Sequence, residues 1–471
     1  MKSNLNEALA EFGLKNIEVE KILNLALRKG GDLAELFFEE TSSSRLFYEG
    51  GRVDRILTGI DRGVGLRILD QGRSVYGYTT DFEQSSMENL AQSLSEALER
   101  PQGSKKSTSA YNWRHTPQPV KEISSYQIQR KPGDLPMASK IEILKKTDEV
   151  ARAEFAGVRQ VSSVFLDSER KILTLNSDGQ FAADTKTYLQ IMVQVVGEKQ
   201  GRIETAYESD GGYVGLEFFD EVHPEEIART AARRVVTLLD AQAAPAGTMT
   251  VVLSSQAGGT MIHEAVGHGL EADLACNGLS VYQGKLGQAV ASPLITVVDD
   301  GTLSGKRGSY CYDDEGTASQ KTVLIENGIL KTYLVDRLSA MKFDLMATGN
   351  GRRESFRHKP IVRMTNTYIA PGQDDPAEIL KSTPQGVFVQ AMGGGQVDTV
   401  TGDFVFAVTE GYLIRDGKLA EPIRGATLVG NGPAVLIHAG QDQGLCKTAQ
   451  WAECQRAIDH CRDAPSLQLN A

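Results

Sequence analysis

Cysteine, histidine and tryptophan are all scarce in this 471-residue chain, which contains 5 Cys, 7 His and 2 Trp. The five cysteines form no regular framework, which argues against a disulfide-stapled secreted scaffold and fits a reducing compartment. No apolar run approaches the roughly 20 residues of a membrane span, and the N-terminus lacks the apolar core of a signal peptide. We therefore expect a cytoplasmic protein with no membrane segment.

Positive charge is also in deficit. Lys and Arg total 50 against 61 Asp and Glu, which gives a net charge of -11 at pH 7. This balance argues against general binding to nucleic acid or to anionic membranes. Hydrophobic residues make up 41% and charged residues 24% of the chain, which is ordinary for a globular protein. The length predicts more than one domain.

Alternating apolar residues and glycine-containing turns in the first half predict an antiparallel sheet with helices. Strands are expected at 34–40, 45–48, 63–69 and 74–78, and helices at 4–29 and 84–100. The pattern returns with strands at 162–166, 171–175 and 188–196, and helices at 137–156 and 223–241. We interpret 1–100 and 137–243 as two similar halves of one N-terminal α+β region, joined by a polar connection.

A domain boundary is expected at 244–247 (APAG), which separates 1–243 from 244–471. Beyond it, a strand at 249–253 leads into a helix that begins apolar and ends rich in glycine. Hairpin signals of the Asp-Gly and Asn-Gly type follow at 299–301, 326–328 and 415–418, as an earlier one does at 176–179. The predicted fold is therefore α+β, with a mainly antiparallel β-rich C-terminal domain that carries this helix.

That helix contains the motif H-E-x-x-x-H, formed by His263, Glu264 and His268. In the zinc-peptidase motif H-E-x-x-H, the two histidines share one helical face and the Glu is the general base. Five residues turn an ideal helix by roughly 500°, so these rings would point about 140° apart. One metal ion can bind both only if the helix unwinds or contains a π-bulge. Gly267 and Gly269 would ease such a distortion.

Two interpretations of this motif compete. The plain one is an unrelated pair of histidines, one buried and one on the surface. The other is a metal site, which we prefer because two of only 7 histidines flank a glutamate within an apolar segment. Zn²⁺ is the expected ion, since it binds neutral imidazole together with carboxylate or thiolate.

Several stretches resemble the TldD branch of the TldD/PmbA peptidase family. Besides the H-E-x-x-x-H motif, they are 313–317 (DDEGT), 349–353 (GNGRR), 363–367 (RMTNT), 393–398 (GGGQVD) and 430–433 (GNGP). The resemblance implies two α+β parts, of which the C-terminal one is catalytic. It also implies a zinc-dependent peptidase subunit that cleaves unfolded or extended peptides, paired with a PmbA/TldE-type paralogue or with a second copy.

The resemblance also implies a third metal ligand. In the family this ligand is a cysteine within a G-x-C-G-K-x-G-Q stretch, and the matching stretch here is 444–450 (GLCKTAQ). Cys446 is therefore the implied third ligand beside the two histidines. The chain departs from the family pattern after this point, because the family's V-P-V-G-x-G-x-P tail is absent. Cys454, His460 and Cys461 lie in the divergent tail and stay alternative ligands.

Three protein ligands would leave one position on zinc open for an activated water molecule, and Glu264 would accept its proton. A cation near the metal would stabilise the oxyanion. The candidates for this role are Arg352, Arg353 and His358. The simpler interpretation of the two arginines is ion pairing with nearby acids such as Glu354.

Asp314 and Glu315 are candidates to hydrogen-bond the ligand histidines without binding the metal themselves. The alternative interpretation is that these acids form an ordinary charged turn. An edge strand of the C-terminal half could align an extended substrate by adding it to a sheet. Two other functions stay open: a non-catalytic scaffold whose zinc site is closed by a fourth protein ligand, and a metal hydrolase that acts on a non-peptide amide. The natural substrate is not indicated.

Overall fold

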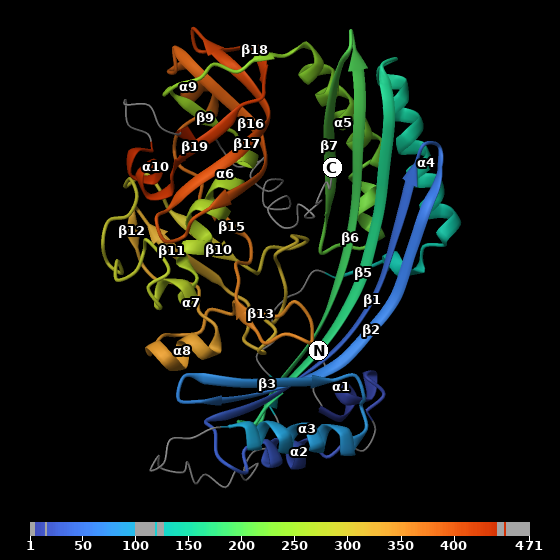
Figure 1. The fold of residues 1–471 in the computed structure, drawn as a ribbon, viewed down its shortest axis with the longest axis vertical. Coiled ribbons are helices and arrows are strands. Elements are labelled where there is room, and N and C mark those ends of the chain that lie inside the picture. Colours follow the sequence, from blue (N-terminus) through green and yellow to red (C-terminus); the bar gives the residue numbers. More distant parts are fainter. Residues whose placement is uncertain (1–4, 15–16, 99–117, 120–126, 440–446, 449–471) are drawn as a thin grey trace.

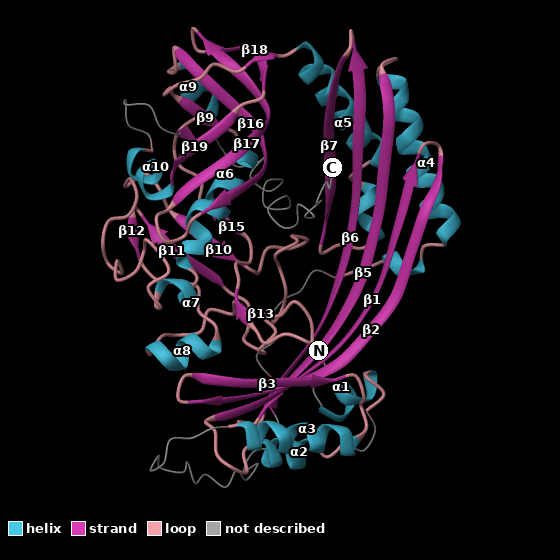
Figure 2. Cartoon of the chain, viewed as in Figure 1, coloured by secondary structure: helices cyan, strands magenta, loops and turns pink. Residues whose placement is uncertain are grey.

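The computed structural model describes the chain apart from residues 1–4, 15–16, 99–117, 120–126, 440–446 and 449–471. A long curved sheet faces a more compact β-rich body built from the second half of the chain (Figure 1). Both parts combine helices with mainly antiparallel strands (Figure 2). The predicted α+β fold is therefore confirmed. None of the described helices is long and apolar enough to cross a lipid bilayer.

The long sheet has seven strands in the order β3-β2-β1-β5-β6-β4, with β7 added beside β6. Their bounds are Leu33–Glu49 (β1), Arg52–Asp70 (β2), Arg73–Thr79 (β3), Gln118–Pro119 (β4), Val158–Asn176 (β5), Gln180–Lys199 (β6) and Arg202–Gly212 (β7). Strands β1 and β5 pair antiparallel from Glu35↔Asn176 to Glu49↔Ser162. The two halves expected from the sequence therefore share a single sheet.

Helices cover this sheet at two places. Helices α1 (Leu5–Glu11), α2 (Val19–Ala26) and α3 (Gln84–Ala97) pack on its lower end, and α4 (Met137–Glu154) and α5 (Pro224–Asp240) lie along its upper part (Figure 1). Alternate residues of β5 and β6 point toward α4 and α5 and are buried, among them Phe165, Ile191, Val193 and Val195. The period of two in the sequence thus builds one apolar face, which positions these helices.

The β-rich body contains two sheets and a short hairpin. The larger sheet comprises β20 (Lys447–Thr448), β9 (Val251–Leu253), β16 (Gln385–Val397), β17 (Asp403–Arg415), β18 (Lys418–Arg424) and β8 (Gln242–Ala243), with β19 (Thr427–Asn431) on β17. The smaller comprises β12 (Ile329–Leu330), β11 (Lys321–Glu326), β10 (Val297–Asp300) and β15 (Thr367–Ile369). The hairpin is β13 (Gly351–Arg352) with β14 (Ile361–Val362).

The remaining elements of the body are short helices. They are α6 (Ser255–Ile262), η3 (His263–Gly267), η4 (His268–Leu270), α7 (Ala272–Ala275), α8 (Arg337–Phe343), α9 (Pro376–Lys381) and α10 (Gly432–His438). Two 3₁₀ turns, η1 (Pro132–Asp134) and η2 (Leu216–Asp220), belong to the N-terminal half. Helix α6 and the turns after it pack against β15, β16 and β17, so both sheets of the body support this segment.

Three of the predicted hairpins are confirmed. The turn at 177–179 joins β5 to β6. Asn327 (φ 48°) with Gly328 (φ 82°), and Asp416 (φ 51°) with Gly417 (φ 71°), form the other two turns. Positive φ at both central residues is what tight two-residue hairpins require. The prediction at 299–301 is wrong, because β10 pairs with β11, which begins only at Lys321.

Candidate metal centre

Helix α6 is anchored at its first residue. Ser254 caps the helix, since its hydroxyl oxygen accepts a hydrogen bond from Ala257 N at 3.1 Å. The same hydroxyl donates to Gln390 O of β16 at 2.6 Å. The residue that follows β9 therefore fixes both the start and the direction of the helix, which runs directly into the H-E-x-x-x-H segment.

The helix widens at the motif. Residues His263–Gly267 form a π-helical turn, and the N–H of His268 donates to His263 O five residues earlier. A 3₁₀ turn, His268–Leu270, follows at once. Of the two distortions that a shared metal ion would require, unwinding or a π-bulge, the structure contains the π-bulge. It adds one residue to the turn, so two side chains five positions apart come to the same side. The two imidazole rings have centroids 5.0 Å apart and planes at 85°.

The two glycines of the segment serve close packing. Gly267 has ordinary right-handed helical angles (φ −58°, ψ −49°). A Cβ on Gly267 would lie 2.0 Å from the sulfur of Met364, and one on Gly269 would lie 2.9 Å from the ring of Tyr282. We expected Gly267 to ease the helix distortion through its backbone freedom, but its backbone angles are ones that any residue adopts. Its role is instead steric: without a side chain, the π-helical turn packs closely against Met364.

The side chains of His263, Glu264 and His268 converge. Each offers one nitrogen or oxygen atom, and these atoms lie within 4.8 Å of one another. Glu264 Oε2 is 4.0 Å from His268 Nε2, and both side chains are partly exposed. Two imidazole nitrogens and a carboxylate with access from solvent form a donor set that suits Zn²⁺. The residues present therefore fit the metal that the motif implies.

A further carboxylate, not singled out from the sequence, holds His268. Glu271 Oε1 lies 3.2 Å from His268 Nδ1. Glu271 is 1% exposed, and its other oxygen accepts from Arg363 at 3.2 Å. A carboxylate on Nδ1 orients the ring and leaves Nε2 free to bind a metal. The available signal was an acid three residues after the second histidine, within reach on one helical turn.

The backbone around Glu271 is equally fixed. Ala272 N donates to Leu334 O at 2.8 Å, and Leu334 N donates to Leu270 O at 2.9 Å. These bonds make an isolated bridge between Glu271 and Leu334. The carboxylate that orients His268 is therefore held by a segment that is distant in sequence.

Charges around the motif shift two pKa values. Burial raises the pKa of Glu264, and the charge of Glu271 adds to this while that of His268 opposes it. Burial favours neutral His268, but its hydrogen bond with Glu271 and the charges of Glu271 and Glu264 outweigh this effect and raise its pKa. Glu271 and Glu264 thus place negative charge beside His268, and a metal ion that binds this ring displaces the proton which that charge favours.

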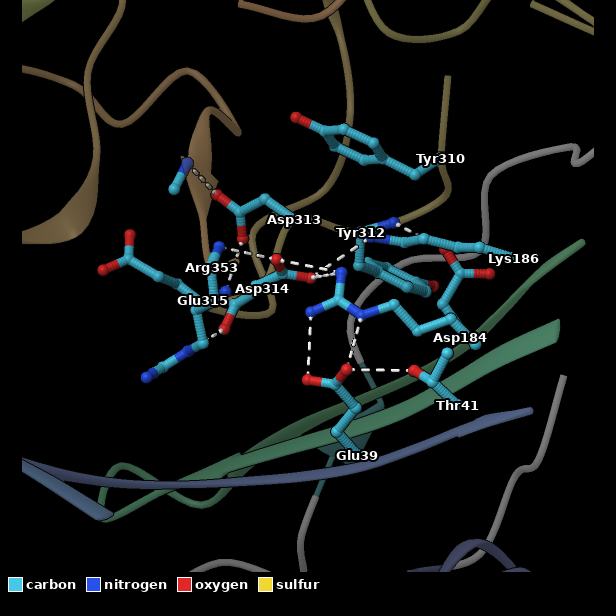
Figure 3. A network of polar contacts seen from close by, with 12 residues as sticks. Glu39, Thr41, Asp184, Lys186, Tyr310, Tyr312, Asp313, Asp314, Glu315 and Arg353 are labelled. Atoms are coloured by element: carbon cyan, nitrogen blue, oxygen red, sulfur yellow. Dashed lines mark hydrogen bonds and ion pairs between the residues drawn. The ribbon is translucent and has the colours of Figure 1, made fainter. Parts of the chain in front are cut away.

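Asp314 and Glu315 do not contact the histidines, which corrects their predicted role. Both are buried in a polar network between the body and the long sheet (Figure 3). Asp314 Oδ1 lies 3.2 Å from both Arg170 of β5 and Lys186 of β6. Glu315 forms an ion pair with Arg67 of β2. Neither acid is a merely charged turn, because both pair with cations that the sheet provides.

The three side chains predicted to stabilise the oxyanion make contacts elsewhere in the structure. Arg353 is buried and its guanidinium pairs with Glu35 of β1, which corrects its predicted oxyanion role because the buried, paired side chain is closed off from solvent. The guanidinium of Arg352 lies over the ring of Tyr310 at 5.9 Å. His358 is half-exposed, with its Nε2 3.8 Å from Glu354.

A different arginine lies beside the motif. The positive charge of Arg363 acts on His268, and its side chain is 44% exposed. Cys446 and the alternative ligands Cys454, His460 and Cys461 lie outside the described residues. Lys447 and Thr448 are described, and they pair in parallel with Val252 and Leu253 of β9.

Fold and site together define an α+β protein with a candidate metal centre in a widened helical turn. The models of three PmbA/TldA metallopeptidase domains match consecutive parts of the chain: domain 1 at 34–100, the central domain at 130–239 and the C-terminal domain at 246–444. The metalloprotease TldD homologue of Haemophilus influenzae is 37% identical over 97% of this chain and 93% of its own. The chain therefore belongs to the TldD/PmbA metallopeptidase family.

Other relatives agree with this placement. A metalloprotease of Methanocaldococcus jannaschii is 35% identical over 88% of this chain and 89% of its own. A protein of Saccharolobus solfataricus named as a zinc metalloprotease TldD homologue is 28% identical over 61% of this chain and 66% of its own. The solved structure of TldE from Thermococcus kodakarensis has the same fold, with a TM-score of 0.73, 18% identity and coverage of 89% of this chain and 92% of that one.

Proposed function

We propose that this chain is a zinc-dependent peptidase subunit that cleaves unfolded or extended peptides in the cytoplasm. The proposed ligands are His263, His268 and Cys446, and Glu264 is the proposed general base. The observation that carries the proposal is the π-helical turn, which brings the two imidazole rings to a centroid distance of 5.0 Å with Glu264 between them in sequence. An undistorted helix would separate the rings.

The third ligand rests on the family resemblance and on one described neighbour. Lys447, the residue after Cys446, pairs with Val252 of β9, and β9 leads through Ser254 into α6. This register places Lys447 beside the strand that leads into the motif helix. The register supports Cys446 over the alternatives further along the tail.

When bound, a zinc ion would act as a Lewis acid and activate a water molecule for attack on a peptide carbonyl. Glu264 would accept the proton and deliver it to the nitrogen of the departing amine. Glu271 holds His268 with Nδ1 as the hydrogen-bonded atom, at 3.2 Å. Arg363, which is paired with Glu271 and partly exposed, is a cation available for the developing oxyanion. Arg352 and His358 stay weaker candidates for that role.

Strand β19 offers a free edge near the motif, along which an extended substrate could pair. In the described part of the chain, β19 pairs with β17 alone. It continues into α10, and a Cβ on Gly432, the first residue of α10, would lie 2.5 Å from Ala265 O in the π-helical turn. A peptide added to β19 would be recognised through its backbone, which suits a broad range of sequences. We also propose that the subunit acts with a PmbA/TldE-type paralogue.

The test is a digest of casein and of an unfolded peptide by the purified chain, with and without a chelator and with and without the paralogue. Wild type should cleave in a chelator-sensitive way, and Glu264→Ala should abolish cleavage while zinc content is unchanged. If Glu264→Ala leaves turnover intact, the general-base assignment is wrong. No cleavage under any condition would favour a scaffold with structural zinc, and turnover only of small amides would favour the non-peptide hydrolase.

A further inference from the structure

Arg363, the cation paired with Glu271, is held at its backbone by a single residue. Arg363 N donates to Asn350 O at 2.9 Å, and Asn350 Nδ2 donates to Arg363 O at 2.9 Å. Asn350 directly precedes β13 and Arg363 directly follows β14, so these two bonds close the base of the short hairpin. The bonds also join the stretches 349–353 (GNGRR) and 363–367 (RMTNT), which the chemistry proposed above leaves without a shared role.

The side-chain amide of Asn350 is buried and bonded at both ends. Asn350 is 1% exposed, as is Asp299, whose Oδ2 accepts from Asn350 Nδ2 at 2.9 Å. The hydroxyl of Thr348 donates to Asn350 Oδ1 at 2.7 Å. A carboxylate and a carbonyl can only accept, so the amide nitrogen must face Asp299 and Arg363. The amide therefore has a single orientation, because turning it over would bring acceptor against acceptor.

Thr348 extends the connection to the backbone of Glu271. Its hydroxyl accepts from Val335 N at 2.7 Å, and its N–H donates to Val335 O at 3.0 Å. The residue before Val335 is Leu334, which bridges to Glu271 through backbone hydrogen bonds. Asn350 therefore reaches Glu271 along two routes, to its carboxylate through the arginine and to its backbone through Thr348.

The route through the arginine matters because the side chain of Arg363 is long and 44% exposed. Such a side chain keeps rotamer freedom unless its backbone and its head group are both fixed. Here Asn350 fixes the backbone, and the carboxylate of Glu271 binds the head group. Loss of Asn350 would free one end, and the carboxylate would then lose the partner that keeps it against His268.

A buried asparagine that only stabilises the fold is the competing interpretation, and the chain contains one for comparison. Asn366 follows Arg363 by three positions and is also 1% exposed. Its Nδ2 donates to Asp300 O at 2.7 Å and to Ser309 Oγ at 2.8 Å, and its Oδ1 accepts from Gly308 N at 2.9 Å. The two asparagines match in burial, but the side-chain bonds of Asn366 lead to the end of β10 and the loop that follows it.

We propose that Asn350 is a positioning residue for the metal centre. It acts through Glu271: by fixing Arg363 and the segment bridged to Glu271, it keeps the carboxylate on His268 Nδ1 and leaves Nε2 for the metal. The proposal rests on the proposed function in one respect, which is that His268 is a zinc ligand.

The first test measures the zinc affinity of the full chain by competition with a chromogenic chelator. Asn350→Ala should weaken zinc binding roughly tenfold, as residues that orient a ligand do when they are lost. Asn366→Ala should lower the melting temperature by a similar amount but leave zinc affinity unchanged. In a Glu271→Gln background, Asn350→Ala should cost no further affinity, because the residue through which it acts is already altered.

The second test needs no metal. In chelator-treated protein with ¹⁵N-labelled histidine, the Nδ1–H of His268 bonded to Glu271 should give a downfield NMR signal, assigned by its loss in His268→Gln. The signal should persist in Asn366→Ala and disappear in Glu271→Gln and in Asn350→Ala. This readout separates the proposal from the peptidase. A chain that binds no zinc but shows this pattern would refute the ligand assignment and support the positioning role.

Thr348→Val is a milder variant, for use if Asn350→Ala does not fold. Valine keeps the shape of threonine but removes the hydroxyl bonded to Asn350, so zinc affinity and the NMR signal should both fall, whereas Thr348→Ser should retain both. The proposal is overturned if Asn350→Ala keeps zinc affinity and the signal as fully as Asn366→Ala does. It is also overturned if Asn350→Ala weakens zinc binding as much in the Glu271→Gln background as in wild type.

Discussion

His268 Nδ1 lies 3.2 Å from Oε1 of the buried Glu271, and the second oxygen of Glu271 accepts from Arg363 at 3.2 Å. The carboxylate is therefore bonded on both sides and cannot turn away from the ring. With Nδ1 held, Nε2 is the atom that His268 presents to the rest of the site. The orientation of one proposed ligand is thus set by the fold before a metal binds.

Glu271→Gln should lower zinc affinity by roughly 10- to 100-fold, because an amide keeps the shape of the side chain but loses the charge that supports His268 and pairs with Arg363. Zinc affinity is measured by competition with a chromogenic chelator. Asp273→Asn is the matched control, since this partly buried carboxylate lies two residues further along the chain, whereas Glu271 is the carboxylate bonded to the ring. Equal affinities in Glu271→Gln and wild type would show that Glu271 does not position the ligand.

Gly267→Ala should destabilise the protein by about 1–3 kcal/mol and weaken zinc binding, because its Cβ would lie 2.0 Å from Met364 Sδ in a packed core. Met364→Ala should relieve part of this loss in the double variant, as thermal unfolding would show. Gly258→Ala in α6 is the control: its Cβ meets nothing within 4 Å, so it should be neutral or stabilising. Equal losses in Gly267→Ala and Gly258→Ala would contradict the packing explanation.

The sequence predicted the motif turn because the constraint is local. Two histidines five residues apart can share one metal ion only in a distorted helix, and the chain forms a widened turn at His263–Gly267. It did not reveal the partners of Arg353 and Asp314, because these lie on strands far away in the chain. Glu35 precedes Arg353 by 318 residues and Arg170 precedes Asp314 by 144. Pairings at such separations depend on the whole sheet topology.

The strands were predicted too short for a related reason. Period-two burial marks a strand only where one face is covered. The first half of β2, residues 52–62, has both faces largely open to solvent and so carries no such alternation. β1 runs without interruption from Leu33 to Glu49, where the sequence predicted two separate strands at 34–40 and 45–48. In both cases backbone pairing with a neighbouring strand decides the structure, and side-chain pattern does not report it.

Asp314→Asn should cost roughly 3–5 kcal/mol of stability and leave zinc affinity unchanged, because it removes the carboxylate that compensates Arg170 and Lys186, which are both largely buried. Thermal unfolding and the chelator competition measure the two effects. Asp240→Asn breaks a surface pair with Lys199 and is the control, with a loss of at most about 1 kcal/mol. Reduced zinc affinity without reduced stability would return Asp314 to the metal site.

Asp336→Asn tests how burial affects stability as the pH changes. Burial, followed by the charge of Glu315, raises the pKa of Asp336 from its usual 3.8 to about 6. The folded protein then holds a proton that the unfolded chain has lost, so the stability due to Asp336 is present below about pH 4 and is lost as pH rises toward 6. Asparagine cannot ionise, and it still caps α8 by accepting from Ser339 N, as Asp336 does at 2.7 Å.

The variant should therefore gain stability relative to wild type between pH 4 and pH 7, by on the order of 2–3 kcal/mol. Thermal unfolding of both proteins across this range measures the difference, in which contributions from other groups cancel. Asp375→Asn is the matched control, because Asp375 caps α9 in the same way but is exposed. A difference between Asp336→Asn and wild type that stays constant with pH would mean that Asp336 ionises equally in the folded and unfolded states.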